Sequence, residues 1–505
     1  MDDLRFDIRI STRDRLLVSI RDFRLSLHQT TFLFGESGIG KSLIARAIYG
    51  LLDPEEFTVT INDEPYETYL ARPETKLIKQ TSFYVFQEPS SHLNPLMPLE
   101  EQVSEGNLSQ PVNATELLTH LWEGTDEEGV RKLLEVYPKP YRPSGGEKQR
   151  VFLLMALKKM DILLRSMPRD TRTLFVFDEP TGSLDNHLRD VFLSLLFTRV
   201  RQSTLTILLI THDYSMVSEV TRSYPDLLDR ISFREISLQQ AGLTLQNFEP
   251  ATYLQWLEHQ KVPVRNETSQ TTNPLLRVGS SAEVFGSRLI ISKDPQGIEA
   301  CPLEIYSGTL VYLKAPSGTG KTTIVKMMMG LIHGEHLEMS LDGMVISENT
   351  PRHFWRRHIW GKKMTMVFQH ADEALNPRST VEETFRGLPG KKRTTREDIR
   401  QALRELSDIE ISDEFLNKPV ATLSGGQKQR INLMRGLFLD TDILILDEPL
   451  NGLDFESTTR VLALLRQKQQ SGKGILLISH NEEIFDTLVL KEHLYYLTAK
   501  PVSQN

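Results

Sequence analysis

The stretch Gly35-Glu36-Ser37-Gly38-Ile39-Gly40-Lys41-Ser42 decides the fold of the first half of the chain. It fits G-x-x-x-x-G-K-[ST], the pattern of a phosphate-binding loop that joins a buried strand to a helix. Residues 31–34 predict that strand, and the apolar spacing of residues 43–52 predicts the helix. In such a loop, glycines let backbone N–H groups close around phosphate oxygens, and the helix N-terminus adds partial positive charge. We expect Lys41 to reach the outer phosphates and the Ser42 hydroxyl to bind Mg²⁺.

A second loop of this kind begins 280 residues later (315 − 35), at Ala315-Pro316-Ser317-Gly318-Thr319-Gly320-Lys321-Thr322. Alanine replaces its first glycine, and a Cβ atom hinders a positive φ. Other features recur in the same order, namely Gln87 with Gln369, Ser144-Gly145-Gly146 with Ser424-Gly425-Gly426, Asp178-Glu179 with Asp447-Glu448, and His212 with His480. The fixed order and the nearly constant offset indicate that one module occurs twice.

The offset between the copies stays within two residues along most of the chain and falls sharply at one place. It is 280 at the two serine-glycine-glycine turns (424 − 144) and 269 at the two aspartates (447 − 178). The difference indicates an insertion of 11 residues (280 − 269) in the first copy, near residues 158–173. We interpret it as a lengthened surface loop, because such loops are tolerated at small entropic cost.

Apolar strands alternate with helices in both copies, so the predicted fold class is α/β with a mainly parallel sheet. Residues 174–178 and 443–447, which end in the two aspartates, are near-continuous apolar runs. Such runs are expected of central parallel strands that are covered on both faces.

The motifs divide the chain into a first domain at residues 1–235 and a second domain at residues 275–505. The intervening residues 236–274 contain none of the motifs and are interpreted as a linker. Within it, residues 250–260 predict one short helix, and the polar, turn-rich residues 266–274 form the core of the linker.

The composition limits the classes of function. With 39% apolar and 25% charged residues, the chain is an ordinary globular protein, and its net charge of −8 gives no basic footprint, so direct nucleic-acid binding is not expected. The single cysteine, Cys301, excludes a disulfide within the chain and a cysteine-ligated cluster. The N-terminus is acidic and no run of 18 apolar residues exists, so we expect a soluble protein whose membrane role needs a partner.

The paired acidic residues predict the chemistry of each copy. An aspartate at the carboxyl end of a strand can hold Mg²⁺ opposite the phosphate loop, which assigns this role to Asp178 and Asp447. The next residues, Glu179 and Glu448, are placed to polarise an attacking water as general bases. A carboxylate pair is a weak signal alone and a strong one beside a phosphate loop.

Each copy also contains one glutamine and one histidine at matching positions. Gln87 and Gln369 offer amide side chains that can reach the metal or the water and can leave when their loop moves. His212 and His480 end apolar strands, where a histidine can contact the γ-phosphate. A lone histidine is usually structural, but recurrence in the same context favours the functional interpretation.

The serine-glycine-glycine turns supply a second anion-binding element. Ser144-Gly145-Gly146 and Ser424-Gly425-Gly426-Gln427 each precede a predicted helix, whose N-terminus attracts negative charge. A module with two phosphate-binding ends favours head-to-tail pairing of the two copies. Nucleotide would then lie between the phosphate loop of one copy and the turn of the other.

These motifs together resemble a tandem ATP-binding-cassette (ABC) ATPase, and the resemblance covers nearly all of the chain outside the linker. It implies two P-loop NTPase (RecA-like) nucleotide-binding domains, each with an antiparallel β subdomain and an α-helical subdomain, that bind and hydrolyse ATP with Mg²⁺. By this resemblance, the first site joins Lys41, Ser42, Gln87, Asp178, Glu179 and His212 to Ser424 and Gly426. The second site joins Lys321, Thr322, Gln369, Asp447, Glu448 and His480 to Ser144 and Gly146. Pro143 and Ala315 depart from the family pattern in the second site, so we expect two active sites, with the first the more effective.

The context of the glutamines points to one branch of the family. Residues 85–95 (VFQEPSSHLNP) are similar to the F-Q-[ED]-P-x-x-S-L-N-P pattern of oligopeptide, dipeptide and nickel importer ATPases, and residues 375–378 keep L-N-P-R. The resemblance implies a subunit that energises import of peptides, nickel or a related small solute. Its partners would be multi-span permease subunits and a substrate-binding protein, and its location would be cytoplasmic and peripheral on the inner face of the cell membrane.

An alternative is a soluble, non-transport ABC ATPase that acts on the ribosome, nucleic acid or another enzyme. An acidic chain without a basic linker is a poor ribosome binder, which favours the importer. A nucleotide-binding scaffold without turnover is least favoured, because both Glu179 and Glu448 are retained.

Overall fold

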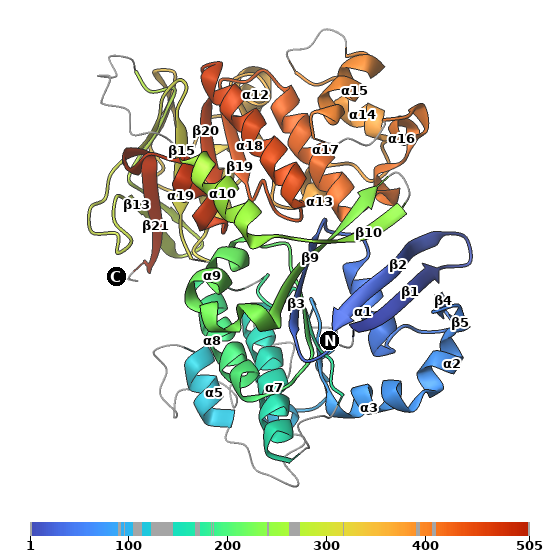
Figure 1. Ribbon diagram of the computed structural model, residues 1–505. Helices are drawn as coiled ribbons and strands as arrows, with labels where there is room; N and C mark the ends of the chain where they lie inside the picture. Colours follow the sequence, from blue (N-terminus) through green and yellow to red (C-terminus); the bar gives the residue numbers. More distant parts are fainter. Residues whose placement is uncertain are drawn as a thin grey trace. The chain divides into compact units, whose positions relative to one another are not determined.

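The computed structural model describes residues 3–88, 92–94, 96–104, 114–122, 145–166, 172–182, 184, 186–239, 242–261, 273–316, 318–389, 394–406 and 411–502. The chain divides into two compact units, Met1–Leu254 and Gln255–Asn505, and each carries one copy of the module (Figure 1).

The first unit is built on a ten-stranded sheet in the order β5-β4-β1-β2-β10-β9-β3-β8-β7-β6. Its strands are β1 (Asp3–Ser11), β2 (Leu16–Ser26), β3 (Thr30–Gly35), β4 (Thr58–Ile61), β5 (Glu64–Pro65), β6 (Tyr84–Val85), β7 (Phe175–Asp178), β8 (Ile207–Ile210), β9 (Ile231–Gln239) and β10 (Gly242–Asn247). The run from β9 through β3, β8 and β7 to β6 is parallel, whereas β1 pairs antiparallel with β2 and β4. The phosphate loop therefore follows the central strand β3, whose residues are all buried.

Helices cover both faces of this sheet. The helices of this unit are α1 (Lys41–Tyr49), α2 (Tyr66–Ala71), α3 (Pro73–Thr81), α4 (Leu99–Ser104), α5 (Ala114–Leu121), α7 (Gly145–Ser166), α8 (Asn186–Gln202), α9 (Ser215–Ser223) and the 3₁₀ helix η2 (Pro225–Arg230). Helix α10 (Pro250–Gln260) begins in this unit and continues past its boundary at Leu254. Alternate residues of β3 face opposite sides: Leu33 joins the core cluster that contains Ile44 of α1, whereas the Phe34 ring stacks 4.7 Å from that of Tyr214. This burial of both faces explains why the central strands are continuously apolar.

Strands β9 and β10 extend the sheet in a stretch that lacks catalytic motifs. Strand β9 pairs with β3, and β10 returns antiparallel along β9, so residues 236–239 and 242–247, for which the sequence predicted a linker, are sheet residues here. Helix α10 confirms the short helix predicted over residues 250–260, and its Tyr253 is buried with its ring 6.4 Å from that of Tyr214. Most of the predicted linker core lies outside the described residues, which resume at residue 273.

The insertion in the first copy extends a helix. Helix α7 has 22 residues and continues to Ser166, whereas its counterpart in the second copy, α17 (Gly425–Phe438), has 14. Lys158 is buried within α7. The expectation of an insertion confined to a surface loop is therefore wrong for residues 158–166, while residues 167–171 lie outside the described part of the chain.

The second unit has two sheets. The seven-stranded sheet has the order β12-β13-β21-β15-β20-β19-β18, and the four-stranded antiparallel sheet has the order β14-β11-β16-β17. The strands are β11 (Leu276–Val278), β12 (Ser281–Val284), β13 (Ser287–Ser292), β14 (Leu303–Ile305), β15 (Leu310–Lys314), β16 (Met339–Leu341), β17 (Met344–Ile346), β18 (Met364–Val367), β19 (Ile443–Asp447), β20 (Gly474–Ile478) and β21 (Leu494–Pro501). Strands β15, β20, β19 and β18 repeat the parallel order of β3, β8, β7 and β6.

The helices of the second unit repeat the pattern of the first. They are α11 (Lys321–Met328), α12 (Arg352–Phe354), the π-helix η3 (Trp355–Ile359), α13 (Ala371–Ala374), α14 (Val381–Phe385), α15 (Arg396–Arg404), α16 (Asp413–Asn417), η4 (Val420–Thr422), α17, α18 (Phe455–Gln470), α19 (Glu482–Leu488) and η5 (Lys491–His493). Each unit thus combines a parallel P-loop sheet, antiparallel strands and a helical region, which confirms the predicted fold class.

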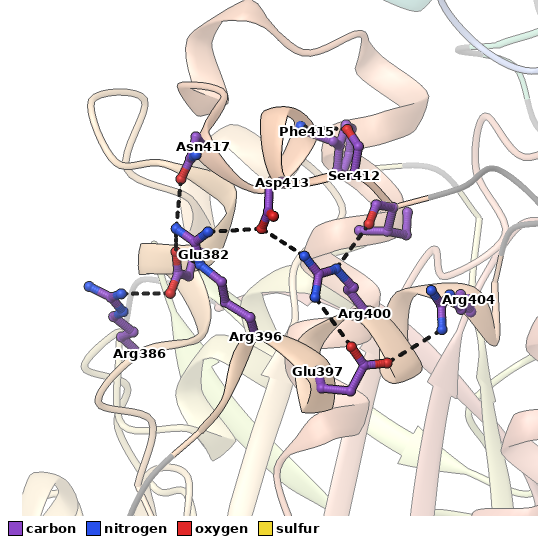
Figure 2. A network of polar contacts seen from close by, with 11 residues as sticks. Glu382, Arg386, Arg396, Glu397, Arg400, Arg404, Ser412, Asp413, Phe415 and Asn417 are labelled. Carbon is purple, nitrogen blue, oxygen red and sulfur yellow. Dashed lines mark hydrogen bonds and ion pairs between the residues drawn. The ribbon is translucent and has the colours of Figure 1, made fainter.

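An ion network holds three short helices of the second helical subdomain together (Figure 2). The largely buried Glu382 of α14 accepts hydrogen bonds from Arg386 (2.6 Å) and from Arg396 Nε of α15 (2.9 Å). Arg396 and Arg400 both donate to Asp413 of α16, at 2.8 and 2.6 Å. Helices of five to nine residues are marginal alone, so these charged bonds and the packing beneath them fix the subdomain.

Candidate active sites

The first phosphate loop wraps around the side chain of Lys41. Gly38 and Gly40 adopt positive φ values of 80° and 110°, which turn the chain into α1. The Lys41 ammonium donates to the carbonyl oxygens of Gly35 (2.5 Å) and Glu36 (2.9 Å), and the side chain is only 4% exposed. A cation is thus held beside a helix N-terminus, as phosphate binding requires.

The second loop repeats this arrangement with one difference. Lys321 donates to the Ala315 carbonyl at 2.5 Å, and Gly318 and Gly320 have φ values of 78° and 102°. Ala315 is absent from the described non-glycine residues with positive φ, whereas Gly35 has φ 141°, and a Cβ there would lie 2.5 Å from the Ile236 carbonyl oxygen. The expectation that alanine strains the second loop is therefore wrong, because the two loops begin with different backbone conformations.

The hydroxyl and carboxylate predicted to bind metal meet in both units. Ser42 Oγ donates to Asp178 Oδ1 at 2.8 Å, and Thr322 Oγ1 donates to Asp447 Oδ2 at 2.7 Å. Both aspartates are buried, and burial raises the pKa of each. These oxygen donors beside a phosphate loop are the ligand type that Mg²⁺ takes, so the residues present fit that ion.

Tyr84 belongs to this site and was missed by the sequence reasoning. Its hydroxyl donates to Asp178 Oδ2 at 3.0 Å from strand β6. The corresponding residue of the second copy, at the offset of 282 that relates Gln87 to Gln369, is Met366, which cannot donate such a bond. The sequence signal for Tyr84 was its place two residues before Phe86-Gln87, a pair that recurs in the second copy.

In the first unit the glutamate after the aspartate faces the histidine. His212 Nδ1 lies 2.8 Å from Glu179 Oε2. Burial raises the pKa of the Glu179 carboxyl, but His212 and Lys41 outweigh it and bring the pKa down to about 2. Burial also opposes the charge on His212, yet Glu179 raises the pKa of the imidazole above its usual value. The pair therefore favours an ionised carboxylate beside a protonated imidazole.

In the second unit the same two residues are held differently. Glu448 Oε2 accepts from the Ser479 hydroxyl (2.8 Å) and the His480 backbone N–H (3.1 Å), while His480 Nε2 is 3.5 Å from Oε1. The His480 ring also lies 3.4 Å from Lys321 Nζ. Burial raises the pKa of Glu448 to about 7 although both bonds oppose the rise. Its buried Oε1 has no hydrogen-bond partner among the described residues, as expected of an oxygen that faces a water site.

The glutamines and the serine-glycine-glycine turns make fewer contacts than the residues above. Gln87 is exposed and Gln369 is half-buried, and neither side chain is hydrogen-bonded to the described residues. Ser424 caps α17 by accepting from the Gln427 N–H (3.2 Å), while Gln427 Oε1 accepts from the Ser424 N–H (3.1 Å). Gly145 and Gly425 are exposed at the first positions of α7 and α17, beside Gly146 and Gly426. Ser144 and Ser317 lie outside the described residues.

Two phosphate loops, each with its own aspartate, glutamate and histidine, define a protein with two ATPase cassettes. A family model described as ABC transporter matches residues 19–182 and 298–451. The chain belongs to this family and is an ATP-binding, ATP-hydrolysing protein with two cassettes. In the parts of the chain that the structure describes, no helix has the length and apolar character needed to cross a membrane.

Curated relatives match the chain over almost its whole length. The glutathione import ATP-binding protein GsiA of Escherichia coli O6:H1 is 24% identical over 541 residues, covering 97% of this chain and 84% of that protein. GsiA of Shigella flexneri serotype 5b is 24% identical over 531 residues, covering 95% and 82%. Both relatives are named as ATP-binding proteins.

Solved structures resemble the chain in fold. The archaeal ribosome recycling factor aABCE1, solved in complex with the ribosomal stalk protein aP1, has a TM-score of 0.61 at 18% identity, covering 95% of this chain and 87% of that one. RNase-L Inhibitor has a TM-score of 0.60 at 19% identity, covering 97% and 89%. At these identities the likeness concerns the fold alone.

Proposed function

We propose that this chain is the ATP-hydrolysing subunit of an importer for a peptide, nickel or a related small solute. The observation that carries the proposal is the match, over 95–97% of the chain, to two GsiA proteins named for glutathione import. The peptide-importer pattern around Gln87 and the L-N-P-R run at residues 375–378 support the same branch.

The described contacts support a role for each residue. Lys41 and Lys321 would hold phosphate oxygens at the helix N-termini. The Ser42–Asp178 and Thr322–Asp447 pairs would hold Mg²⁺, which shields phosphate charge when bound. Glu179 and Glu448 would each accept a proton from the attacking water. Pairing of the two cassettes around ATP, with the serine-glycine-glycine turns completing the sites, stays a prediction.

The histidines are proposed to serve the two bases in different ways. In the first site, an imidazolium at His212 keeps Glu179 ionised and ready to accept a proton. In the second site, Ser479 and the His480 backbone orient Glu448, and the His480 ring is left beside Lys321, where the outer phosphate is expected.

The partners in this proposal are other protein chains. A path for the solute would come from multi-span permease subunits, and a substrate-binding protein would deliver the solute to them. The chain would then sit at the inner face of the cell membrane, bound to its permeases. The net charge of −8 supports protein partners over nucleic acid.

Native co-purification tests this function. The tagged chain is isolated from detergent-solubilised membranes and from the soluble fraction of its own cells, and the partners are identified by mass spectrometry. The proposal expects multi-span permeases in near-stoichiometric amounts from the membrane fraction, and ATP-dependent solute uptake when that complex is placed in vesicles. Association with ribosomes and with no integral membrane protein would contradict the importer and favour a non-transport ATPase.

A further inference from the structure

The second unit contains a cavity of about 320 Å³ that is separate from the phosphate loop. It lies between the end of α11, the β16–β17 hairpin and the segment formed by α12 and the π-helix. Its apolar wall is made of Met327, Met339, Ile346, Trp355 and Trp360. A volume above roughly 300 Å³ with aromatic walls is typical of a small-molecule site.

The two tryptophans are held in place by specific contacts. The Trp360 Nε1–H donates to the Met329 carbonyl at 2.8 Å, and the two indole rings lie 6.4 Å apart. Gly330, at φ 63°, lets the Trp355 ring approach closely, since a Cβ there would lie 2.3 Å from that ring. The backbone N–H of Trp360 donates to the Trp355 carbonyl at 2.9 Å. This bond closes the π-turn that places both rings at the cavity. Such π-turns are rare in proteins, and those that occur are often found at functional sites.

The rim of the cavity carries opposite charges. Glu348 and Arg352 both line it, and both are exposed. Neither side chain makes a hydrogen bond or an ion pair with any described residue, so the two are not paired with each other. By contrast, the neighbouring Ser347 and Thr350 bond to each other. The Ser347 N–H donates to Thr350 Oγ1 and the Thr350 N–H donates to the Ser347 carbonyl, both at 3.0 Å. The rim therefore offers one free anion and one free cation above an apolar, aromatic floor.

We propose that this cavity binds a small zwitterion, an α-amino acid with an apolar or aromatic side chain. The side chain would enter between the tryptophans and methionines, where apolar contact and sulfur–aromatic contact stabilise it. The carboxylate would pair with Arg352, whose guanidinium fits it with two hydrogen bonds, and the ammonium would pair with Glu348. The charge pair selects against apolar ligands that carry only one of the two groups.

The cavity has a direct connection to the second phosphate loop. Met327 lies in the last turn of α11 and Gly330 lies two residues beyond its end, while the first residues of this helix are Lys321 and Thr322. A ligand that fixes one end of this helix of eight residues would alter the position of the phosphate-binding lysine at its other end. Binding itself does not depend on the importer function proposed above, because it is a property of the second unit alone.

Titration calorimetry on the full chain tests the inference with four probes: L-phenylalanine, L-leucine, phenethylamine (no carboxylate) and 3-phenylpropionate (no ammonium). We expect saturable binding of the two amino acids and at least about tenfold weaker binding of both single-charge analogues. Arg352→Ala should weaken L-phenylalanine about tenfold while leaving phenethylamine unchanged. The exposed Arg356→Ala, in the same segment and outside the cavity lining, serves as the matched control and should bind like the wild type.

Three outcomes would overturn the proposal. These are the absence of saturable amino-acid binding at millimolar concentrations, equal affinity in Arg352→Ala and wild type, and displacement of L-phenylalanine by ATP, which would place the ligand in the nucleotide site. Because Arg352 and Glu348 are exposed, their substitution leaves the fold intact, and circular dichroism of each variant checks this. Met339→Trp, which fills the cavity, provides an independent test and should abolish binding of both amino acids.

Discussion

His212 Nδ1 lies 2.8 Å from Glu179 Oε2, whereas in the second unit His480 Nε2 is 3.5 Å from Glu448 Oε1 and its ring lies beside Lys321. The same pair of residue types thus forms an ion pair in one site and a looser contact in the other. The proton affinity of the two glutamates differs accordingly, with pKa values of about 2 and about 7. Several measurable asymmetries follow from this difference.

The first prediction concerns the pH dependence of turnover. In Glu448→Gln only the first site keeps its glutamate base. Because Glu179 is ionised at every pH well above its pKa of about 2, the residual ATP hydrolysis should vary little between about pH 6 and 8. Glu179→Gln leaves the second site, whose base becomes ionised as the pH rises through about 7, so its residual hydrolysis should climb over that interval. Steady-state phosphate release over this range checks both variants, and parallel pH profiles would contradict the assignment.

The second prediction concerns stability. The pKa of Glu179 is lowered on folding, so this carboxylate stabilises the fold at pH values above its pKa in the unfolded chain. This stabilisation is lost as the pH falls through about 2. Glu179→Gln should therefore destabilise the first unit at pH 7 by about 2–3 kcal/mol. The pKa of Glu448 is raised, so its ionisation costs stability as the pH rises from the unfolded value through about 7. Glu448→Gln should therefore stabilise the second unit at pH 8 by roughly the same amount, with little effect at pH 5.

Hydrogen exchange resolves these effects by unit. Peptides from β7 should lose protection in Glu179→Gln at pH 7, and peptides from β19 should gain it in Glu448→Gln at pH 8. A change of the same sign in both variants would show that the two carboxylates share one environment.

The third prediction uses the first residue of each phosphate loop. Gly35→Ala introduces a Cβ that meets the Ile236 carbonyl at 2.5 Å and forces φ 141° on alanine, which should cost about 1–3 kcal/mol and weaken ATP binding. Ala315→Gly is the matched control, because Ala315 occupies no positive φ, and it should change nucleotide affinity little. Nucleotide titration and urea unfolding of both variants provide the check, and a mild Gly35→Ala phenotype would argue that the loop rearranges.

The fourth prediction compares the two lysines. At pH 7 the second site has a base that is about half protonated, so Lys41→Ala should reduce ATP turnover more than Lys321→Ala. At about pH 8.5 Glu448 is ionised, and the gap between the two variants should narrow. Equal losses at both pH values would remove the asymmetry.

The sequence was sufficient for the parts of the fold that repeat. The strands before the two loops, the acidic strands and the meeting of Ser42 with Asp178 follow from motif order, because parallel strands bring their carboxyl ends to one edge. The helix over residues 250–260 was also predictable from its composition.

Other features depend on contacts that no motif encodes. Asp-Glu is identical in both copies, so the different proton affinities of Glu179 and Glu448 arise from neighbours. His212 lies 2.8 Å from Glu179 and lowers the pKa of its carboxyl, whereas the His480 ring is 3.5 Å from Glu448 and burial raises the pKa of that carboxyl. The unstrained backbone at Ala315 and the pairing of residues 236–239 with residues 242–247 in the sheet likewise come from tertiary packing. Local patterns could not distinguish these cases.

The most direct test of the account is steady-state ATP hydrolysis by the double variant Glu179→Gln/Glu448→Gln, with each single variant and the wild type alongside. Because both substitutions remove a proposed general base and leave the phosphate loops unchanged, turnover should fall by about 10²–10⁴-fold while ATP is still bound. Turnover of the double variant equal to that of the wild type would contradict the assignment of Glu179 and Glu448 as the catalytic bases.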